Sequence, residues 1–238
     1  MRDLILSAKA KTWRMADRNF EQNDVEWSRL RTSVLQRDDY TCQFCDFRAR
    51  KWQEVHHLDD DHNNDDLDNL VTACSFCHQV HHIGLAGLTD SAKLAWIPEM
   101  THQEIHHMIR TKLVLAHWVS RQPPNAPSHE LPGFSVAVQA LDSAITQRSL
   151  IVKEMIGTDN PVVLGDALIA MSDNENYSRR AELLSGIRLV PTGRLVRGDS
   201  DKIPKMIENW IEPSGPYAGM QPHTWGALLR QYQPMLED

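Results

Sequence analysis

The spacing of apolar and polar residues in the N-terminal half of the chain predicts two amphipathic helices. The first covers residues 25–36. Its apolar stripe contains Trp27, Leu30, Val34 and Leu35. The second begins after Thr101, which precedes Glu104 by three residues, the spacing of a capping box in which each side chain satisfies an unpaired amide of the first turn. The apolar stripe of this helix contains Ile105, Met108, Ile109, Leu113 and Ala116.

The C-terminal half shows a longer series of helical patterns. Helices are expected over residues 135–156, 161–171 and 178–187. Gly157 closes the first of them, and Asn160 with Pro161 opens the second as N-cap and first helical residue. A fourth helix is predicted by the stripe of Ile203, Met206, Ile207, Trp210 and Ile211. The C-terminal half is therefore predicted to be a helical domain.

Near the C-terminus, a last amphipathic turn or two lies between segments rich in proline and glycine. Its apolar residues are Trp225, Leu228, Leu229 and Tyr232. Two interpretations stay open, because such a helix either packs on its own domain or binds a partner protein.

Strand signals are short and few. Leu4 and Leu6 alternate near the start, and residues 94–97 have the pattern of a short strand before Pro98. The segment SRQPPNAPSHELPG at residues 120–133 contains four prolines, which end any helix. We therefore predict an α+β, mostly helical fold with a first domain at residues 1–119, a linker at 120–134 and a helical domain with a C-terminal tail at 135–238.

Composition indicates an ordinary globular protein. The chain has 238 residues, of which 41% are hydrophobic and seven are tryptophan, enough to bury a core. No stretch approaches the roughly 20 apolar residues of a membrane span, and the opening MRDLILSAKAKTWRM has too short an apolar run for a signal peptide. We therefore expect a cytoplasmic protein without direct membrane insertion.

All four cysteines lie in two CxxC pairs, Cys42 with Cys45 and Cys74 with Cys77. Two such pairs suit one tetrahedral zinc ion, and four thiolates leave no open position, so the zinc would be structural. A reducing cytosol favours metal binding over the alternative of disulfides. The segment between Cys45 and Cys74 is longer than the roughly 15–20 residues of the usual zinc ribbon, so it is expected to carry structure of its own. Trp13, Met15 and Phe20 are expected to be packing anchors that cover this module.

The zinc module resembles the HNH, or ββα-metal, nucleases over residues 37–83. The matching features are the EVHH sequence ending at His57, then Asn69, then a helix that opens with Cys77-His78 and also carries His81 and His82. The resemblance implies a ββα-metal module with a second divalent metal ion. It assigns His56, His78 and His82 as ligands, His57 as the general base on the attacking water, and Asn69 as the residue that orders the loop.

The geometry of a strand limits this assignment. Adjacent residues of a regular strand point to opposite faces, so His56 and His57 enter one site only where the strand breaks. The loop that follows is rich in aspartate and permits such a break. Its acidic residues are Asp59, Asp60, Asp61, Asp65, Asp66 and Asp68.

The charge distribution argues against a protein built mainly to bind nucleic acid. The net charge is −7, whereas phosphate-binding surfaces are usually basic. The acidic loop beside His57 would repel DNA, so nucleic-acid binding is expected to be weak and salt-dependent. His102 and His106 have the spacing of metal ligands on the second predicted helix. Without a third donor nearby, we interpret them as surface histidines.

A second resemblance covers the chain from Leu4 to about Trp210. Its motifs, in order, are TWRMADRNF, QRDDYTCQFCDFRAR, DNLVTACSFC, WIPEMTHQEI, IRLVPTGR and MIENW. They resemble the IcmJ/DotN family of type IVB secretion and conjugation systems. The resemblance implies a zinc-bearing subunit of the cytoplasmic coupling complex, peripheral at the inner face of the inner membrane. Such a subunit docks on the extended C-terminal tail of the coupling ATPase, contacts other subunits and helps to recruit substrates.

The sequence is therefore consistent with two functions. One is a zinc-stabilised adaptor of a coupling complex, favoured by the motifs along the chain and by the acidic charge. The other is a metal-dependent HNH endonuclease or nickase that uses His57 as general base. The implied adaptor family keeps the four cysteines without the paired histidines, whereas this sequence keeps all five residues of the nuclease pattern. These residues are His56, His57, Asn69, His78 and His82.

Overall fold

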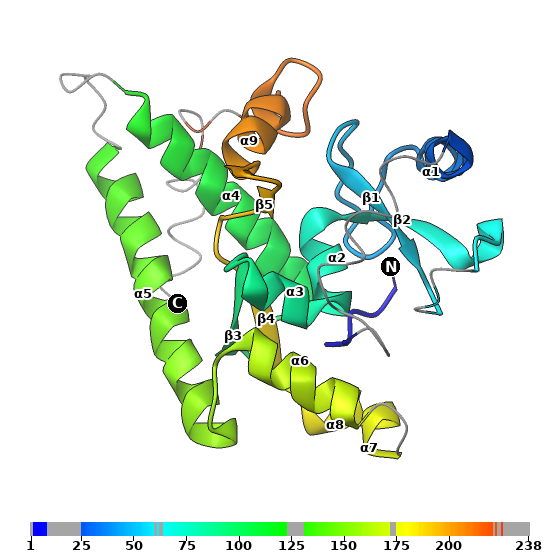
Figure 1. The fold of residues 1–238 in the computed structure, drawn as a ribbon. Helices are drawn as coiled ribbons and strands as arrows, with labels where there is room; N and C mark the ends of the chain where they lie inside the picture. Colours follow the sequence, from blue (N-terminus) through cyan, green and yellow to red (C-terminus); the bar gives the residue numbers. More distant parts are fainter. Residues whose placement is uncertain are drawn as a thin grey trace.

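The computed structural model describes residues 2–8, 25–59, 61, 64–122, 131–171, 175–220, 222 and 225. It is an α+β fold built mainly from helices, which confirms the predicted fold class (Figure 1). The sheets found in these residues are three antiparallel pairs of short strands. None of the described helices combines the length and the apolar character needed to span a bilayer.

The N-terminal part is a hairpin between two helices. Its elements are α1 (Val25–Arg37), β1 (Gln53–His57), the short 3-10 helix η2 (Leu67–Asn69), β2 (Leu70–Cys74) and α2 (Ser75–His81). β1 and β2 pair from Gln53 opposite Cys74 to His57 opposite Leu70. α1 packs on one side of the hairpin through a small core made by Val34, Leu35, Val55 and Leu70. α2 follows β2 directly, so strand, strand and helix form one continuous unit.

The remaining elements surround a second strand pair. They are α3 (Ile83–Leu88), β3 (Ala92–Trp96), α4 (His102–Ser120), α5 (Leu131–Ile156), α6 (Pro161–Ala170), α7 (Glu175–Ser178), α8 (Arg180–Leu183), β4 (Ile187–Pro191), β5 (Val196–Arg197), β6 (Ser200–Asp201) and α9 (Ile203–Ile211). β3 pairs antiparallel with β4, from Ala92 opposite Pro191 to Trp96 opposite Ile187. α5 packs on β3, and α4 packs on β4, α5 and α9. Segments before and after the proline-rich residues therefore share one sheet.

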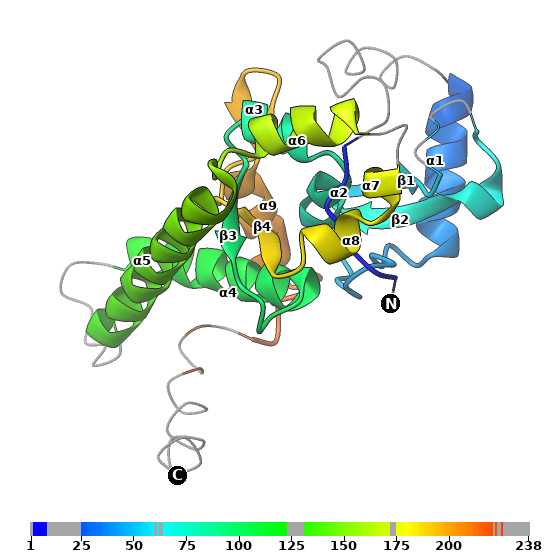
Figure 2. The same ribbon diagram turned by 90° about the horizontal axis from the view of Figure 1, so that it is seen from below.

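Glycine allows α3 and α6 to pack closely. A Cβ atom on Gly165 would lie 3.0 Å from the Cα atom of Gly84, closer than nearly all real Cβ contacts. The two helices lie side by side in both views (Figures 1 and 2). Any larger residue at position 165 would push α6 away from α3.

The N-terminal segment of residues 2–8 passes between α2 and the C-terminal half of the chain. Ser7 N donates to Val80 O at 3.0 Å, and Ile83 N donates to Ser7 O at 3.3 Å. On the other side, Tyr177 Oη donates to Ala8 O at 2.8 Å. Figure 2 shows α7 and α8 beside this segment. The expected anchors Trp13, Met15 and Phe20 lie outside the described residues.

Both predicted helix caps are confirmed. Thr101 Oγ1 accepts from Glu104 N at 3.2 Å, while Glu104 Oε2 accepts from Thr101 N at 2.7 Å. Asn160 Oδ1 accepts from Val162 N at 2.9 Å at the start of α6. The side chains of the two caps thus satisfy amides that have no partner within the helix.

The prediction of one helix over residues 178–187 is wrong. The segment contains the end of α7 and the short α8, and Ile187 begins β4 instead. Ile187, Leu189 and Val190 are all buried, so the strand IRLVP lacks the alternation of a half-exposed strand. α5 also begins at Leu131, inside the predicted linker. In the predicted C-terminal turn, Trp225 is half-buried against the main core, while Leu228, Leu229 and Tyr232 lie outside the described residues.

Candidate metal centre

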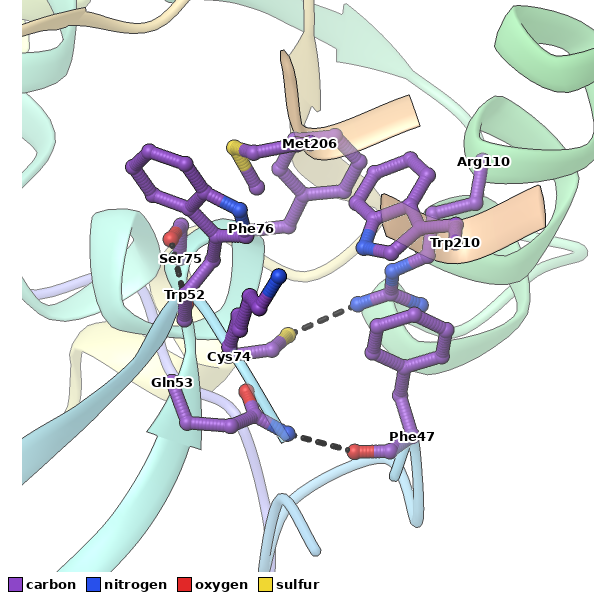
Figure 3. A pocket seen from close by; sticks show the side chains of 10 residues that line it. Phe47, Trp52, Gln53, Cys74, Ser75, Phe76, Arg110, Met206 and Trp210 are labelled. Atoms are coloured by element: carbon purple, nitrogen blue, oxygen red, sulfur yellow. Dashed lines mark hydrogen bonds between the residues drawn. The ribbon is translucent and has the colours of Figure 1, made fainter. Parts of the chain in front are cut away.

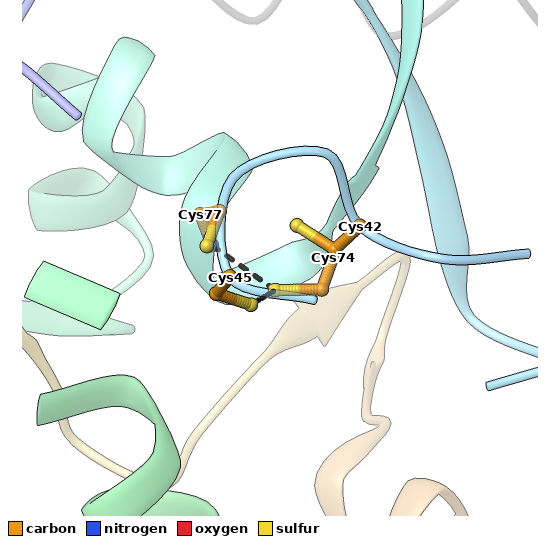
Figure 4. Close-up of side chains that lie close together, drawn as sticks. All are labelled: Cys42, Cys45, Cys74 and Cys77. Atoms are coloured by element: carbon orange, nitrogen blue, oxygen red, sulfur yellow. Dashed lines mark hydrogen bonds between the residues drawn. The ribbon is translucent and has the colours of Figure 1, made fainter. Parts of the chain in front are cut away.

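The first cysteine pair lies in a tight turn held by main-chain hydrogen bonds. Cys42 N donates to Phe47 O at 3.0 Å, and Asp46 N donates to Cys42 O at 2.9 Å. Asp46 has a φ of 57°, in the left-handed region that aspartate tolerates better than most residues. The turn carries Cys42 and Cys45 toward the end of β2 and the start of α2 (Figure 4).

The second cysteine pair lies at the junction of β2 and α2. Cys74 is the N-cap of α2, and its Sγ accepts a hydrogen bond from Cys77 N at 3.4 Å. The N-terminal end of a helix carries a partial positive charge, which favours the thiolate form of a cysteine placed there. The strand-to-helix junction therefore brings the sulfur atoms of Cys74 and Cys77 together at the first turn of α2.

The four sulfur atoms fit a zinc ion. They all lie within 4.8 Å of one another, and each cysteine is at most 4% exposed. Cys45 Sγ and Cys74 Sγ are 3.7 Å apart, close to the roughly 3.8 Å that separates two sulfurs on a tetrahedral zinc with bonds of about 2.3 Å. All four cysteines are free, so the disulfide alternative is not realised. The donor set and the spacing suit a closed, structural site.

Helix α4 places two further side chains on these sulfurs. Arg110 Nη2 donates to Cys74 Sγ at 2.7 Å and to Cys45 Sγ at 3.6 Å. His106 Nδ1 lies 3.3 Å from Cys77 Sγ. Burial raises the pKa of Cys74, but hydrogen bonds from the other cysteines and the charge of Arg110 outweigh it and lower that pKa overall. Burial lowers the pKa of Arg110, but the thiolates outweigh it and raise that pKa overall.

The interpretation of His102 and His106 as surface histidines is wrong. They are 4% and 0% exposed, because they lie on the face of α4 that packs against other elements, whereas Glu104 and His107 of the same helix are exposed. His102 Nε2 accepts from Leu189 N at 3.0 Å. Burial and the charge of Arg188 lower the pKa of His102 to about 3, so it is neutral at pH 7. The sequence analysis did not identify Arg110. A charged residue on the apolar face of a predicted helix indicates that an oppositely charged partner lies beside it in the interior.

Aromatic rings enclose the guanidinium of Arg110. Its central carbon lies 4.1 Å from the ring centroid of Phe47 and 5.1 Å from that of Phe76. Trp210 of α9 packs edge-on against Phe47, with centroids 5.6 Å apart. Figure 3 shows these rings around the bond between Arg110 and Cys74. The rings keep water away from the charge and so strengthen its interaction with sulfur.

The nitrogens of His56, His78 and His82 form a second cluster, within 4.8 Å of one another. His78 Nε2 and His82 Nε2 are 3.2 Å apart, near the roughly 3.3 Å expected for two nitrogens bound to one zinc ion at about 2.0–2.1 Å. His78 Nδ1 faces Glu54 Oε2 at 2.5 Å. That contact directs the Nδ1 proton to the carboxylate and leaves the Nε2 lone pair available to a metal.

The carboxylate of Glu54 is shared between the two halves of the chain. Arg197 Nη2, from β5, donates to Glu54 Oε1 at 2.6 Å. Burial raises the pKa of Glu54, but the charges of Arg197 and His78 outweigh it and hold the pKa well below its usual value. Burial and the neighbouring histidines lower the pKa of His56, which favours the neutral form that binds metal.

The structure does not bring His57 together with this cluster. β1 stays regular through His56 and His57, so the strand break that the nuclease assignment requires is absent. The His57 ring stacks on Trp27 of α1, with centroids 5.4 Å apart and an interplanar angle of 9°. Its Nε2 lies 3.0 Å from Asp65 Oδ1. The His56 ring stacks on His81 of α2 at 4.0 Å. The two histidines therefore lie on opposite sides of the hairpin.

Asn69 lies at the base of the loop that connects β1 and β2. Its Oδ1 accepts from Asp59 N at 3.1 Å, and its Nδ2 donates to Asp59 Oδ1 at 2.9 Å and to Asn64 O at 2.8 Å. Its main-chain oxygen accepts from Leu58 N at 2.9 Å. These bonds hold the two ends of the acidic loop together.

The chain is similar in sequence to a known protein of a secretion apparatus. No model of a known protein family matches the chain. The chain is 32% identical over 213 residues to the type 4 apparatus protein DotN of Legionella pneumophila strain Philadelphia 1. The similarity covers 87% of this chain and 89% of that protein. It therefore extends over most of both molecules rather than over the cysteine pairs alone.

Proposed function

Because the chain belongs to the IcmJ/DotN family, we propose that it is a zinc-stabilised adaptor subunit of a type IVB secretion apparatus. In this role it docks on the extended C-terminal tail of the coupling ATPase, contacts other subunits of the coupling complex and helps to recruit substrates. It acts in the cytoplasm, at the inner face of the inner membrane, through the secretion complex. The observation that carries the proposal is the similarity to a type 4 apparatus protein over most of both chains.

The closed geometry of the cysteine cluster supports a structural rather than a catalytic zinc. Four thiolates complete the tetrahedron, so no position is left for water or substrate. The sulfurs are buried and come from the turn that carries Cys42 and Cys45 and from the junction of β2 with α2. A metal in that place joins these two segments of the chain, which stabilises a platform for binding other proteins.

Exposed apolar side chains of α5 support a role in assembly. They are Val136, Leu150, Ile151, Met155 and Ile156, which are between 39% and 63% exposed. All but Val136 lie close together at the C-terminal end of the helix, which ends at Ile156. Exposed apolar side chains that gather in this way are typical of a surface that another protein covers. We propose that the ATPase tail binds at this end of α5.

Co-purification with the cognate ATPase tail tests the proposal. The wild-type protein should bind the tail at micromolar concentration, and the double variant Leu150→Asp with Met155→Asp should lose at least about ten-fold in affinity, because buried apolar anchors dominate such contacts. Val25→Asp is the control, since Val25 is 65% exposed on the remote helix α1. A folded wild-type protein that does not bind the tail would refute the adaptor proposal.

A second candidate function, a metal-dependent HNH endonuclease or nickase, is favoured by the cluster of His56, His78 and His82. A divalent ion held there would clamp a phosphate, and three histidines leave a position open for it. The position of His57 argues against it, because a general base must reach the water at that ion and His57 faces α1 instead. The acidic loop beside His57 also repels DNA.

Plasmid cleavage with Mg²⁺ or Mn²⁺ tests this second function. We expect weak or no cutting of plain duplex DNA by the wild-type protein. Robust cutting that depends on the divalent ion, and that His57→Ala abolishes while the protein stays folded, would show the nuclease function and would establish His57 as its base.

A further inference from the structure

Arg110 carries a charge in the interior of the protein, with sulfur atoms as its hydrogen-bond partners. The residue is 1% exposed, and its Nη2 lies 2.7 Å from Cys74 Sγ and 3.6 Å from Cys45 Sγ. Within the part of the chain that the structure describes, Nη1 has no hydrogen-bond partner. A buried guanidinium needs an anion beside it, and here the thiolates occupy that position.

His106 contacts the sulfur atom on the far side of the cluster. It is fully buried, and its Nδ1 lies 3.3 Å from Cys77 Sγ. A zinc-bound thiolate has no proton to donate, so the hydrogen bond requires that Nδ1 carries the proton and donates it to sulfur. His106 and Arg110 are four residues apart on α4 and therefore share one helix face.

The charge of the zinc site explains why such donors are needed. Four thiolates and one Zn²⁺ ion carry a net charge of −2, which is costly in a dry interior. Arg110 brings one positive charge to Cys74 and Cys45, and His106 adds an N–H donor at Cys77. Cys42 is the one cysteine to which α4 supplies no donor among the described residues.

We infer that Arg110 and His106 are outer-sphere positioning residues of the zinc site, which protect it by reducing the nucleophilicity of the three thiolates they contact. The inference rests on the zinc proposed above. A hydrogen-bonded, charge-compensated thiolate is a poorer nucleophile and a poorer target for oxidants and alkylating agents. Loss of zinc would also leave Arg110 without its counter-charge, so the metal and the packing of α4 support each other.

The test is the rate of zinc release when the native, zinc-loaded protein is treated with N-ethylmaleimide in the presence of a chromogenic zinc chelator. Arg110→Met keeps most of the apolar stem but removes the charge, and should release zinc about ten- to a hundred-fold faster, the usual effect of losing an outer-sphere partner. Arg121→Met is the matched control. Arg121 ends the same helix, is exposed, and pairs with Glu208 instead of sulfur, so its loss should change the rate less than about two-fold.

The order in which the cysteines react separates this role from simple packing. Cys42 is 0% exposed and Cys74 is 4% exposed, so exposure alone predicts that Cys74 reacts first. The outer-sphere role predicts the reverse, with Cys42 alkylated first in the wild-type protein and Cys74 and Cys45 gaining most in Arg110→Met. Peptide mapping by mass spectrometry gives this order. A uniform rise at all four cysteines would indicate loosened packing and would overturn the inference.

Arg110→Lys keeps the test decisive if the methionine variant does not fold. Lysine retains the charge but lacks the planar fork that reaches two sulfurs, so zinc release should be several-fold faster than in the wild type and slower than in a charge-free variant. A lysine variant that matches the wild type in rate and in cysteine order would refute the inference. A wild-type protein that contains no zinc by elemental analysis would instead refute the zinc proposal itself.

Discussion

The two candidate metal clusters share one strand–strand–helix unit but differ in what surrounds them. The four cysteines are at most 4% exposed, and α4 covers them with Arg110 and His106. The cluster of His56, His78 and His82 is partly open, and its support comes from Glu54 on the hairpin and Arg197 on β5. The cysteine cluster lies inside the main core, whereas the histidine cluster lies at its edge.

This difference separates two kinds of site. A metal in the cysteine cluster would be part of the folded core, because its ligands are buried there and come from two segments, the turn of Cys42 and Cys45 and the junction of β2 with α2. A metal in the histidine cluster would add to a fold that already exists, since β1 and α2 are positioned by the hairpin and by packing. Loss of the metal from the cysteine cluster should therefore unfold the protein. Loss of the metal from the histidine cluster should empty that site and leave the fold intact.

The largest effect is expected from breaking the cysteine cluster. Cys77→Ser should remove the zinc and with it the cooperative fold, because structural zinc contributes roughly 10 kcal/mol or more, comparable with the whole stability of a domain. Zinc content after dialysis and thermal unfolding measure the effect, with about one tightly held zinc expected per wild-type chain. His82→Ala is the control and should keep that zinc. A metal-free protein with an unchanged cooperative transition would contradict the prediction.

Acid should act on α4 through His102. Its pKa of about 3 in the folded state lies below the value of 6.5 in the unfolded state, so the unfolded chain binds more protons between those values. The free energy of unfolding should thus fall as pH decreases from about 6.5 toward 3, by about 1.4 kcal/mol per pH unit from this group. His102→Gln keeps an acceptor for Leu189 N and should lose about 2 kcal/mol less than the wild type between pH 7 and pH 5. Urea unfolding at both pH values measures this difference, and equal losses would exclude the role of His102.

The smallest effect on stability is expected from the histidine cluster. His78→Ala should abolish binding of Co²⁺ as a probe of that cluster, while the melting temperature changes by only a few degrees. Glu54→Gln should weaken Co²⁺ binding by about ten- to a hundred-fold, since the neutral amide orients His78 less well. Absorption spectra of protein with zinc in the cysteine site give both affinities. If His78→Ala unfolded the protein as Cys77→Ser is expected to, the distinction between the clusters would be lost.

The parts of the structure that depend on local signals could be predicted from the sequence. The CxxC spacing predicted that Cys42, Cys45, Cys74 and Cys77 would meet, and the caps at Thr101 and Asn160 marked two helix starts. The resemblance to HNH nucleases predicted that His56, His78 and His82 would meet. Each of these signals lies within a few residues or within a known motif.

Contacts between distant segments could not be predicted in this way. Arg110 meets Cys74 across 36 residues, and Arg197 meets Glu54 across 143 residues. The spacing of apolar residues along the chain does not show which distant segments meet. His102 and His106 of α4 were therefore interpreted as exposed, because their partners lie on distant segments. β4 was missed because both of its faces are covered, and the absence of a strand break at His57 depends on pairing with Leu70.

The pairing of β3 with β4 means that this part of the protein can fold only after most of the chain has been synthesised. The partners Ala92 and Pro191 are far apart in the chain, so a nascent chain that has been synthesised only as far as α4 presents Leu94 and Ala95 on an unpaired strand edge. Unpaired apolar edges recruit other chains, and pairings of such long range form slowly. A fragment of residues 1–119 should therefore aggregate when expressed alone, even with zinc supplied, and should be rescued by co-expression of residues 131–220.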